Sequence, residues 1–119
     1  MPPFRLLLAL VLLAIPAALH SAEKSAPSEG ASLVKDGQPQ AEIIIAENPQ
    51  RSARLAAHEL QTYVQKISGA KLPIVTRPSG TMPVKLYVGR SADTDRLKIT
   101  ADGLKDGAYR IATGPDWMC

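Results

Sequence analysis

The chain has a single cysteine, Cys119, at its last position, so it can form no internal disulfide and no multi-cysteine metal site. Aromatic residues make up only 4% of the sequence, which is little for a sugar-stacking or base-stacking surface. The net charge of +3 comes from scattered cations and not from a run of them, so nucleic-acid binding is not indicated. What remains is a 119-residue chain with 45% hydrophobic residues, enough for one small globular domain.

Catalytic motifs are equally scarce. His58 and Glu59 begin the H-E-x-x-H pattern of zinc proteases, but Thr62 stands where the second histidine is required. There is no G-x-S-x-G nucleophile elbow, phosphate-binding loop or dinucleotide fingerprint. Without two imidazoles on one helix face, we expect no zinc site here.

Four aspartates come closest to the paired carboxylates of a glycosidase: Asp93, Asp95, Asp102 and Asp106. Each lies in a polar stretch near a lysine or arginine, so we interpret them as solvated loop charges. We likewise interpret the single tryptophan, Trp117, as a packing residue, and we find no basic neighbour that would lower the pKa of Cys119. The sequence therefore predicts no catalytic, cofactor-binding or metal-binding residue.

Residues 1–22 have the organisation of a secretory signal peptide. Arg5 precedes an apolar run over residues 6–15, and a small-residue stretch ends at Ala22. The run is too short to span a bilayer comfortably. We expect cleavage near Ala22 and a secreted or periplasmic mature protein that is not membrane-bound. The small polar residues 23–32 predict a flexible leader.

A long amphipathic helix is the central feature of the remainder. We predict that Asn48 caps it, that Pro49 opens its first turn, and that Gly69 ends it in the left-handed conformation. Lys66 lies in its last turn, where the helix dipole favours a cation. The predicted buried stripe consists of Ala53, Ala56, Ala57, Leu60, Val64 and Ile67, and the predicted solvated face of Arg54, His58, Gln61 and Gln65.

Strands are predicted on both sides of this helix. Residues 32–35 and 41–46 are expected to pair as a hairpin around the turn Asp36-Gly37. The contiguous isoleucines at 43–45 indicate a strand covered on both faces. Residues 72–76 follow the helix directly, which predicts a βαβ unit with parallel strands.

Further strands are expected at residues 84–88, where apolar and polar residues alternate, and at 109–112, with Tyr109 and Ile111 on one face. A short helical turn capped by Ser91 is expected between them. Residues 33–119 are thus predicted to form an α/β (α+β) domain: a mixed β-sheet with a βαβ unit and one long helix packed on it.

Four segments of this pattern resemble a known family: A-E-N at residues 46–48, A-A-H-E-L-Q-T-Y-V-Q-K-I-S-G-A-K-L-P-I-V at 56–75, V-K-L-Y-V-G-R-S at 84–91, and D-G-A-Y-R-I at 106–111. Together they resemble the α-glucuronidase N-terminal domain family, akin to the second domain of bacterial β-hexosaminidases. The resemblance covers about residues 33–117. It implies a sheet with helices packed on it, preceding a (β/α)₈ barrel that carries the catalytic carboxylates.

The resemblance implies the non-catalytic N-terminal domain of an exported glycoside hydrolase that acts on complex polysaccharide, with the catalytic barrel as its partner. The barrel and the family's second helix are not in this sequence, so we expect a truncated domain whose sheet lacks cover on one face. The alternative is a free-standing exported carbohydrate-binding module, which should be stable alone. A hydrolase complete in these residues has no catalytic constellation to support it.

Overall fold

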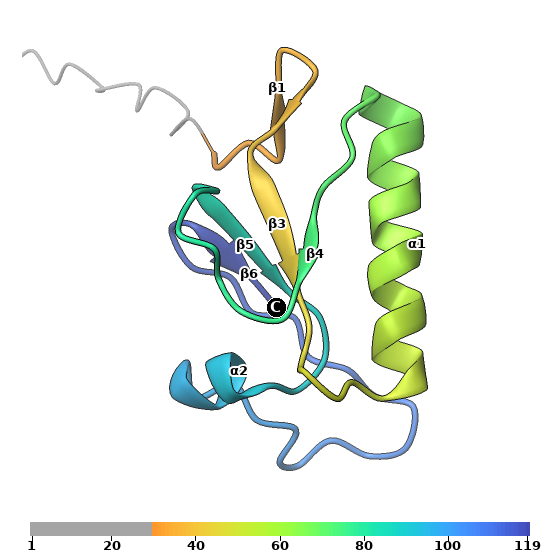
Figure 1. Cartoon of the computed structure of the whole chain (residues 1–119). Coiled ribbons are helices and arrows are strands. Elements are labelled where there is room, and N and C mark those ends of the chain that lie inside the picture. Colours follow the sequence, from red (N-terminus) through yellow and green to blue (C-terminus); the bar gives the residue numbers. More distant parts are fainter. Residues whose placement is uncertain (1–29) are drawn as a thin grey trace, which may run out of the picture.

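The computed structural model describes residues 30–119, in which one long helix packs on one face of a four-stranded sheet (Figure 1). A separate two-stranded hairpin precedes the sheet, and a short helix lies beyond the carboxyl ends of its central strands. This arrangement confirms the predicted α/β class. The predicted signal peptide and most of the predicted leader lie outside the described residues.

The elements in chain order are β1 (Val34–Lys35), β2 (Gln38–Pro39), β3 (Ala41–Ile44), α1 (Arg51–Ser68), β4 (Ile74–Val75), β5 (Val84–Tyr87), α2 (Ala92–Arg96) and β6 (Trp117–Met118). The sheet order is β4-β3-β5-β6, and all three pairings are parallel. Ile43 of β3 stands opposite Ile74 on one side and Leu86 on the other. β3, α1 and β4 therefore form the predicted βαβ unit.

The predicted turn of the hairpin is confirmed, but its predicted return strand is wrong. Asp36 and Gly37 both have positive φ, at 51° and 72°, as a type I′ turn requires. A two-residue turn places Lys35 opposite Gln38, so β2 pairs with β1 and the hairpin closes before the isoleucines begin. β3 instead enters the parallel sheet, where its backbone has partners on both sides.

α1 begins later than predicted. Its N-cap is Gln50, which makes no side-chain capping hydrogen bond, and Asn48 lies outside the helix. The residue before a proline disfavours the helical conformation, and Gln50 itself is non-helical at φ −58° and ψ 152°. The predicted end is confirmed: Gly69 is left-handed at φ 77°, and its N–H donates to the Gln65 carbonyl at 2.8 Å.

The buried face of α1 is only partly the predicted stripe. Ala57 is fully buried and Leu60 and Val64 pack on the core, but Ile67 is 83% exposed. Gln61, predicted on the solvated face, donates from Nε2 to the Leu72 carbonyl at 2.6 Å. The helix of 18 residues is about 27 Å long, whereas the four residues of β3 span about 13 Å. Its last turn therefore extends past the sheet and Ile67 has nothing to cover it (Figure 1).

The core lies between α1 and the sheet, and it is formed by Ala41, Ile43, Ile45, Ala57, Leu72, Val84 and Leu86. The opposite face of β3 is also covered, because Glu42 and Ile44 have no solvent exposure. The expectation of an uncovered second face is therefore wrong at β3. Part of that cover is the connection from β4 to β5, whose Ser79 amide donates to Glu42 Oε1 at 3.0 Å.

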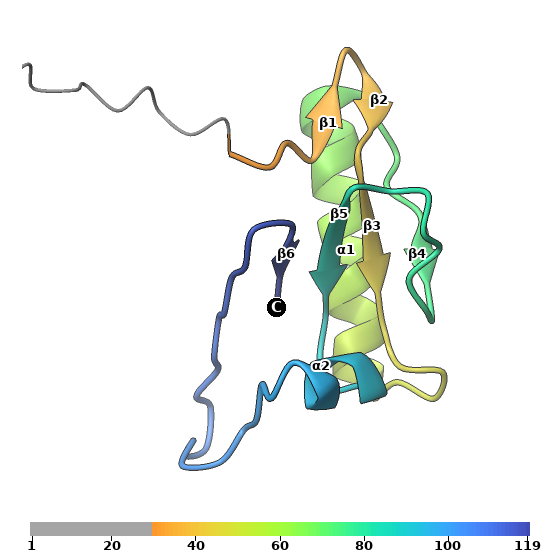
Figure 2. The same cartoon turned by 90° about the vertical axis from the view of Figure 1, so that its left-hand side faces the viewer.

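The predicted strand at 109–112 is also wrong. Tyr109 is 80% exposed and Ile111 63% exposed, and the edge of the sheet beside β5 is taken by β6 instead. Figure 2 shows the segment between α2 and β6 running apart from the strands. Ala112 and Cys119 exchange two backbone hydrogen bonds, at 2.9 and 2.8 Å. The Trp117 indole lies directly over Gly114. The alternation of side chains at residues 109–112 predicted a strand, but a strand also needs a free sheet edge, and β6 occupies the edge beside β5.

We predict that Gly89→Ala destabilises the domain more than Gly103→Ala does. Both glycines are left-handed, at φ 77° and 76°, so alanine costs about 1 kcal/mol of backbone strain at either position. A Cβ at Gly89 would also lie 2.9 Å from the Cβ of Ala53 on α1, whereas one at Gly103 meets nothing within 4 Å. We expect about 1–2 kcal/mol of additional loss at Gly89 in chemical denaturation. Equal losses would show that α1 does not approach this turn closely.

Candidate functional site

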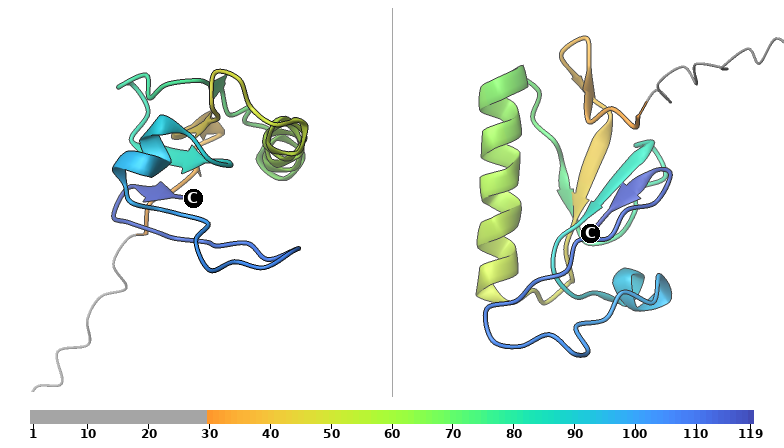
Figure 3. Two further views of the ribbon diagram at one scale, coloured as in Figure 1. Left: turned by 90° about the horizontal axis from the view of Figure 1, so that it is seen from below. Right: turned by 180° about the vertical axis from the view of Figure 1, so that it is seen from behind.

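The carboxyl ends of the parallel strands surround a hollow of about 460 Å³. Six of its lining residues carry side-chain hydroxyls or charges, and we call the site the polar hollow: Glu47, Thr76, Arg77, Ser91, Asp93 and Arg96. They follow β3, β4 and β5 and belong in part to α2, which lies beyond the ends of these strands (Figures 1 and 3).

The order of the sheet reverses at this place. From β3 the chain passes through α1 to β4 on one side, and from β4 it crosses to β5 on the other side of β3. In open parallel sheets, ligands bind outside the carboxyl ends of the strands at such a reversal. Two hollows lie at this edge of the sheet, the polar hollow and a second one at the start of α1, and the polar hollow is the one lined by two ion pairs.

Two ion pairs line the polar hollow. Arg77 donates from Nε and Nη2 to Glu47 Oε1, and Arg96 donates from Nη2 to Asp93 Oδ1. Arg77 and Arg96 are largely exposed, while Asp93 is buried, with 7% of its surface exposed. The charges of the four side chains cancel, so the surface is rich in donors and acceptors without a net charge.

Both walls of the polar hollow are anchored by hydrogen bonds, buried on one wall and partly buried on the other. On α2, the Ser91 amide donates to Thr94 Oγ1 at 2.8 Å and the Thr94 amide donates to Ser91 Oγ at 3.3 Å, which is a reciprocal capping box. On the other wall, the chain that follows Arg77 is tied to β3 through Glu42 and Ser79. The sequence predicted the Ser91 cap, and the structure confirms it.

Glu42 is a residue that sequence reasoning missed. It is fully buried in the central strand, and within the described residues its Oε2 has no hydrogen-bond partner. A glutamate beside three isoleucines was a signal that could have been used, since a strand covered on both faces buries every side chain it carries. Its carboxylate oxygen Oε1 is the one that fixes the β4–β5 connection.

Tyr87 shares the face of the sheet on which Glu42 lies. Glu42 is opposite Lys85 and Ile44 is opposite Tyr87 in the register of β3 with β5. Lys85 Nζ binds Asp116 Oδ2 at 3.3 Å. The pKa of Tyr87 is raised above its ordinary value, mainly by partial burial and secondly by the nearby carboxylate of Asp116. The phenol is therefore held in its neutral form.

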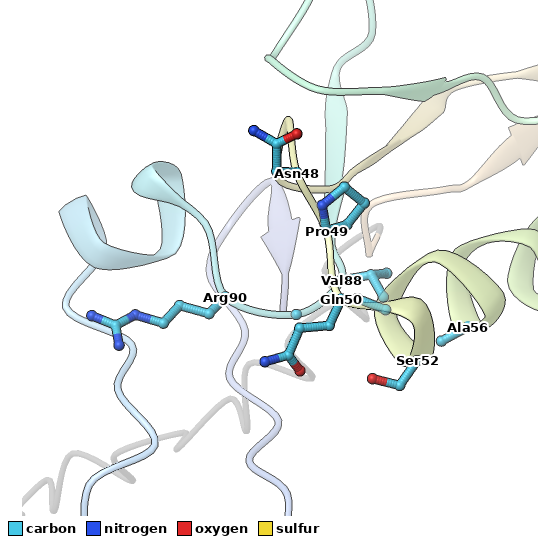
Figure 4. A pocket seen from close by; sticks show the side chains of 9 residues that line it. Asn48, Pro49, Gln50, Ser52, Ala56, Val88 and Arg90 are labelled. Carbon is cyan, nitrogen blue, oxygen red and sulfur yellow. The ribbon is translucent and has the colours of Figure 1, made fainter.

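A second hollow, of about 520 Å³, opens where α1 begins (Figure 4). It lies between the first turn of α1 and the chain that follows β5, and its lining includes Gln50, Ser52 and Arg90. Figure 4 shows the Arg90 side chain directed away from the helix start, and its Nε binds Asp95 Oδ1 at 3.1 Å. Its polar lining residues are Asn48, Gln50, Ser52 and Arg90, and among the residues that the structure describes no ion pair joins two of them.

The residues considered for metal binding lie on the exposed face of α1. His58 and Glu59 are both exposed, beside Tyr63 and Lys66, whose ammonium is 5.4 Å from the centroid of the Tyr63 ring. In residues 30–119, no group of three or more His, Cys, Asp or Glu side chains is placed to hold a metal ion.

The four aspartates considered as acid pairs do not converge. Asp93 binds Arg96 in the polar hollow, whereas Asp95 binds Arg90 outside it. Asp102 and Asp106 are exposed in the segment between α2 and β6. Asp93 instead shares the polar hollow with Glu47, a residue that the sequence did not single out.

Cys119 has the environment of an unreactive thiol. Its burial raises its pKa above the ordinary value, which disfavours the nucleophilic thiolate. This agrees with the sequence, which showed no cation to lower that pKa.

Comparisons with protein-family models, with curated proteins and with solved structures find no match to this chain. Among residues 30–119, no helix has the length and apolar character needed to cross a membrane.

We predict that Glu42→Ala lowers the free energy of unfolding by about 2–3 kcal/mol, because it opens a cavity and leaves the Ser79 amide without its acceptor. Glu42→Gln should cost less than Glu42→Ala, since it fills the same space and its amide oxygen can accept from Ser79. Denaturant unfolding with hydrogen exchange at Ser79 tests both variants. Equal losses in the two would mean that the charge itself stabilises the fold.

Alkaline pH should destabilise the domain partly through Tyr87. A tyrosine whose pKa is raised by folding contributes stability that is complete below its unfolded pKa of 10.0 and is lost as pH rises above that value. We therefore expect the unfolding free energy of Tyr87→Phe to fall less steeply above pH 10 than that of the wild type. The exposed Tyr109→Phe is the matched control and should follow the wild type. Identical slopes for all three proteins would contradict a raised pKa at the half-buried Tyr87.

Proposed function

We propose that this chain is a non-catalytic α/β domain of an exported carbohydrate-active enzyme, of the α-glucuronidase type of glycoside hydrolase, and that it packs against a larger catalytic barrel domain. The resemblance of residues 33–117 supports the family, and the βαβ unit with one long helix is consistent with it. The described residues bring together neither a nucleophile with a base nor a metal site.

The observation that carries the packing role is the pair of exposed apolar side chains Tyr109 and Ile111. They are 80% and 63% exposed, in a segment that resembles part of the family pattern. Large apolar side chains left in water cost about 25 cal/mol for each Å² of apolar surface. Close neighbours of this kind are typical of a surface that another domain covers.

The second candidate is a free-standing exported carbohydrate-binding module. The polar hollow favours it, because the hollow presents donors and acceptors at the position where an open parallel sheet binds ligands. The two candidates differ in the expected behaviour of the isolated chain: a module is a stable monomer, whereas a packing domain exposes its interface.

We predict that the mature chain, residues 23–119, binds a hydrophobic dye such as ANS and self-associates, because its interface is uncovered. The double substitution Tyr109→Ser with Ile111→Ser should reduce both dye binding and light scattering. Ile67→Ser, which removes one of the three exposed large apolar side chains of α1 (Leu55, Tyr63 and Ile67), is the comparison variant and should change them less than the double substitution does. Fluorescence and light scattering during thermal unfolding give the readout.

The same preparation should release no sugar from aryl glycosides or glucuronoxylan fragments. A monomer that binds no dye and unfolds in one sharp transition would favour the binding module over the packing domain. Sugar release that co-purifies with the chain and is lost on Asp93→Asn would overturn both.

A further inference from the structure

We infer that the polar hollow binds vicinal hydroxyl groups of a neutral sugar residue. The inference rests on the proposed function for its ligand class, carbohydrate, and it holds whether the domain packs on a catalytic partner or acts as a module. The site itself is defined by the two ion pairs Glu47–Arg77 and Asp93–Arg96, which line one hollow from separate elements.

The free hydrogen-bonding capacity of these pairs matches a diol. Arg77 uses two of its five N–H groups on Glu47, and only Oε1 of that carboxylate is engaged. Arg96 likewise donates to Oδ1 of Asp93. Among residues 30–119, the second carboxylate oxygen of each acid, Oε2 of Glu47 and Oδ2 of Asp93, takes no part in the two ion pairs. A hydroxyl is both donor and acceptor, so neighbouring hydroxyls can accept from a guanidinium and donate to the free carboxylate oxygen beside it.

Charge balance favours a neutral ligand over an anion. Both guanidiniums already have carboxylate partners, so an acidic ligand would meet a positive charge that is largely neutralised and would be repelled by Glu47 and Asp93 beside it. A neutral diol adds to the existing pairs without breaking them. Hydrogen bonds to charged groups are stronger than those between neutral groups, so a small number of contacts gives useful affinity.

The walls of the hollow are fixed before a ligand arrives. Asp93 is buried in a helical turn that the Ser91–Thr94 capping box holds, and Glu42 binds the connection that follows Arg77. Neither wall has to be ordered on binding, which removes one of the main entropic costs of recognition.

The test is a titration of the ¹⁵N-labelled mature chain with a neutral oligosaccharide, xylotriose or cellotriose, followed by amide chemical shifts. We expect shifts at millimolar sugar that are centred on residues 76–79 and 91–96. Arg77→Ala should weaken binding about tenfold or more. Arg77→Lys should also weaken it, because it keeps the charge but loses the planar fork. Arg77 is exposed in a surface ion pair, so both variants should remain folded.

Arg90→Ala is the matched control, since it removes an arginine from an exposed ion pair outside the polar hollow and should leave the affinity unchanged. Three results would overturn the inference. The first is no amide shift at millimolar neutral sugar, and the second is shifts centred on Trp117 instead of the polar hollow. The third is that glucuronate binds while the neutral sugars do not, and that added salt abolishes this binding. The dye-binding and light-scattering experiment tests the packing role separately, so either idea can fail without the other.

Discussion

The structure depends on burying both faces of one short strand. All four residues of β3 have no solvent exposure, so one face is covered by α1 and the other in part by the connection from β4 to β5. Hydrophobic contact is sufficient for the first face. On the second face, Ile44 is accompanied by a carboxylate, and a buried charge is tolerated only where hydrogen bonds compensate its lost hydration. The Ser79 amide supplies one such bond.

That compensation links the core to the polar hollow. Ser79 lies two residues after Arg77, so the hydrogen bond to Oε1 of Glu42 also fixes the chain carrying one of the two guanidiniums. The other wall is set by the capping box that starts α2. The hollow therefore consists of polar groups on anchored backbone, although it lies in loops at the edge of the sheet.

The described surface carries two kinds of feature. The polar hollow lies at the carboxyl ends of the central strands and its charges are paired. Large exposed apolar side chains occur on α1 and along the chain after α2: Leu55, Tyr63, Ile67, Leu97, Tyr109, Ile111 and Met118. The two kinds of feature meet at the end of α2, where Leu97 directly follows Arg96.

Local chemistry in the sequence determined the features that need few distant partners: the Asp36-Gly37 turn, the left-handed end of α1 at Gly69, the Ser91 cap and the alternation in β5. The βαβ unit also followed, because a helix between two apolar runs leaves the second strand parallel to the first. Partner choice was decided by tertiary structure. β1 paired with β2 and not with the isoleucines, β6 and not residues 109–112 took the edge, and α1 turned Gln61 inward. The meeting of Glu47, Arg77, Asp93 and Arg96 could not be predicted, because these residues are separated in the chain and only the sheet order brings their elements to one edge.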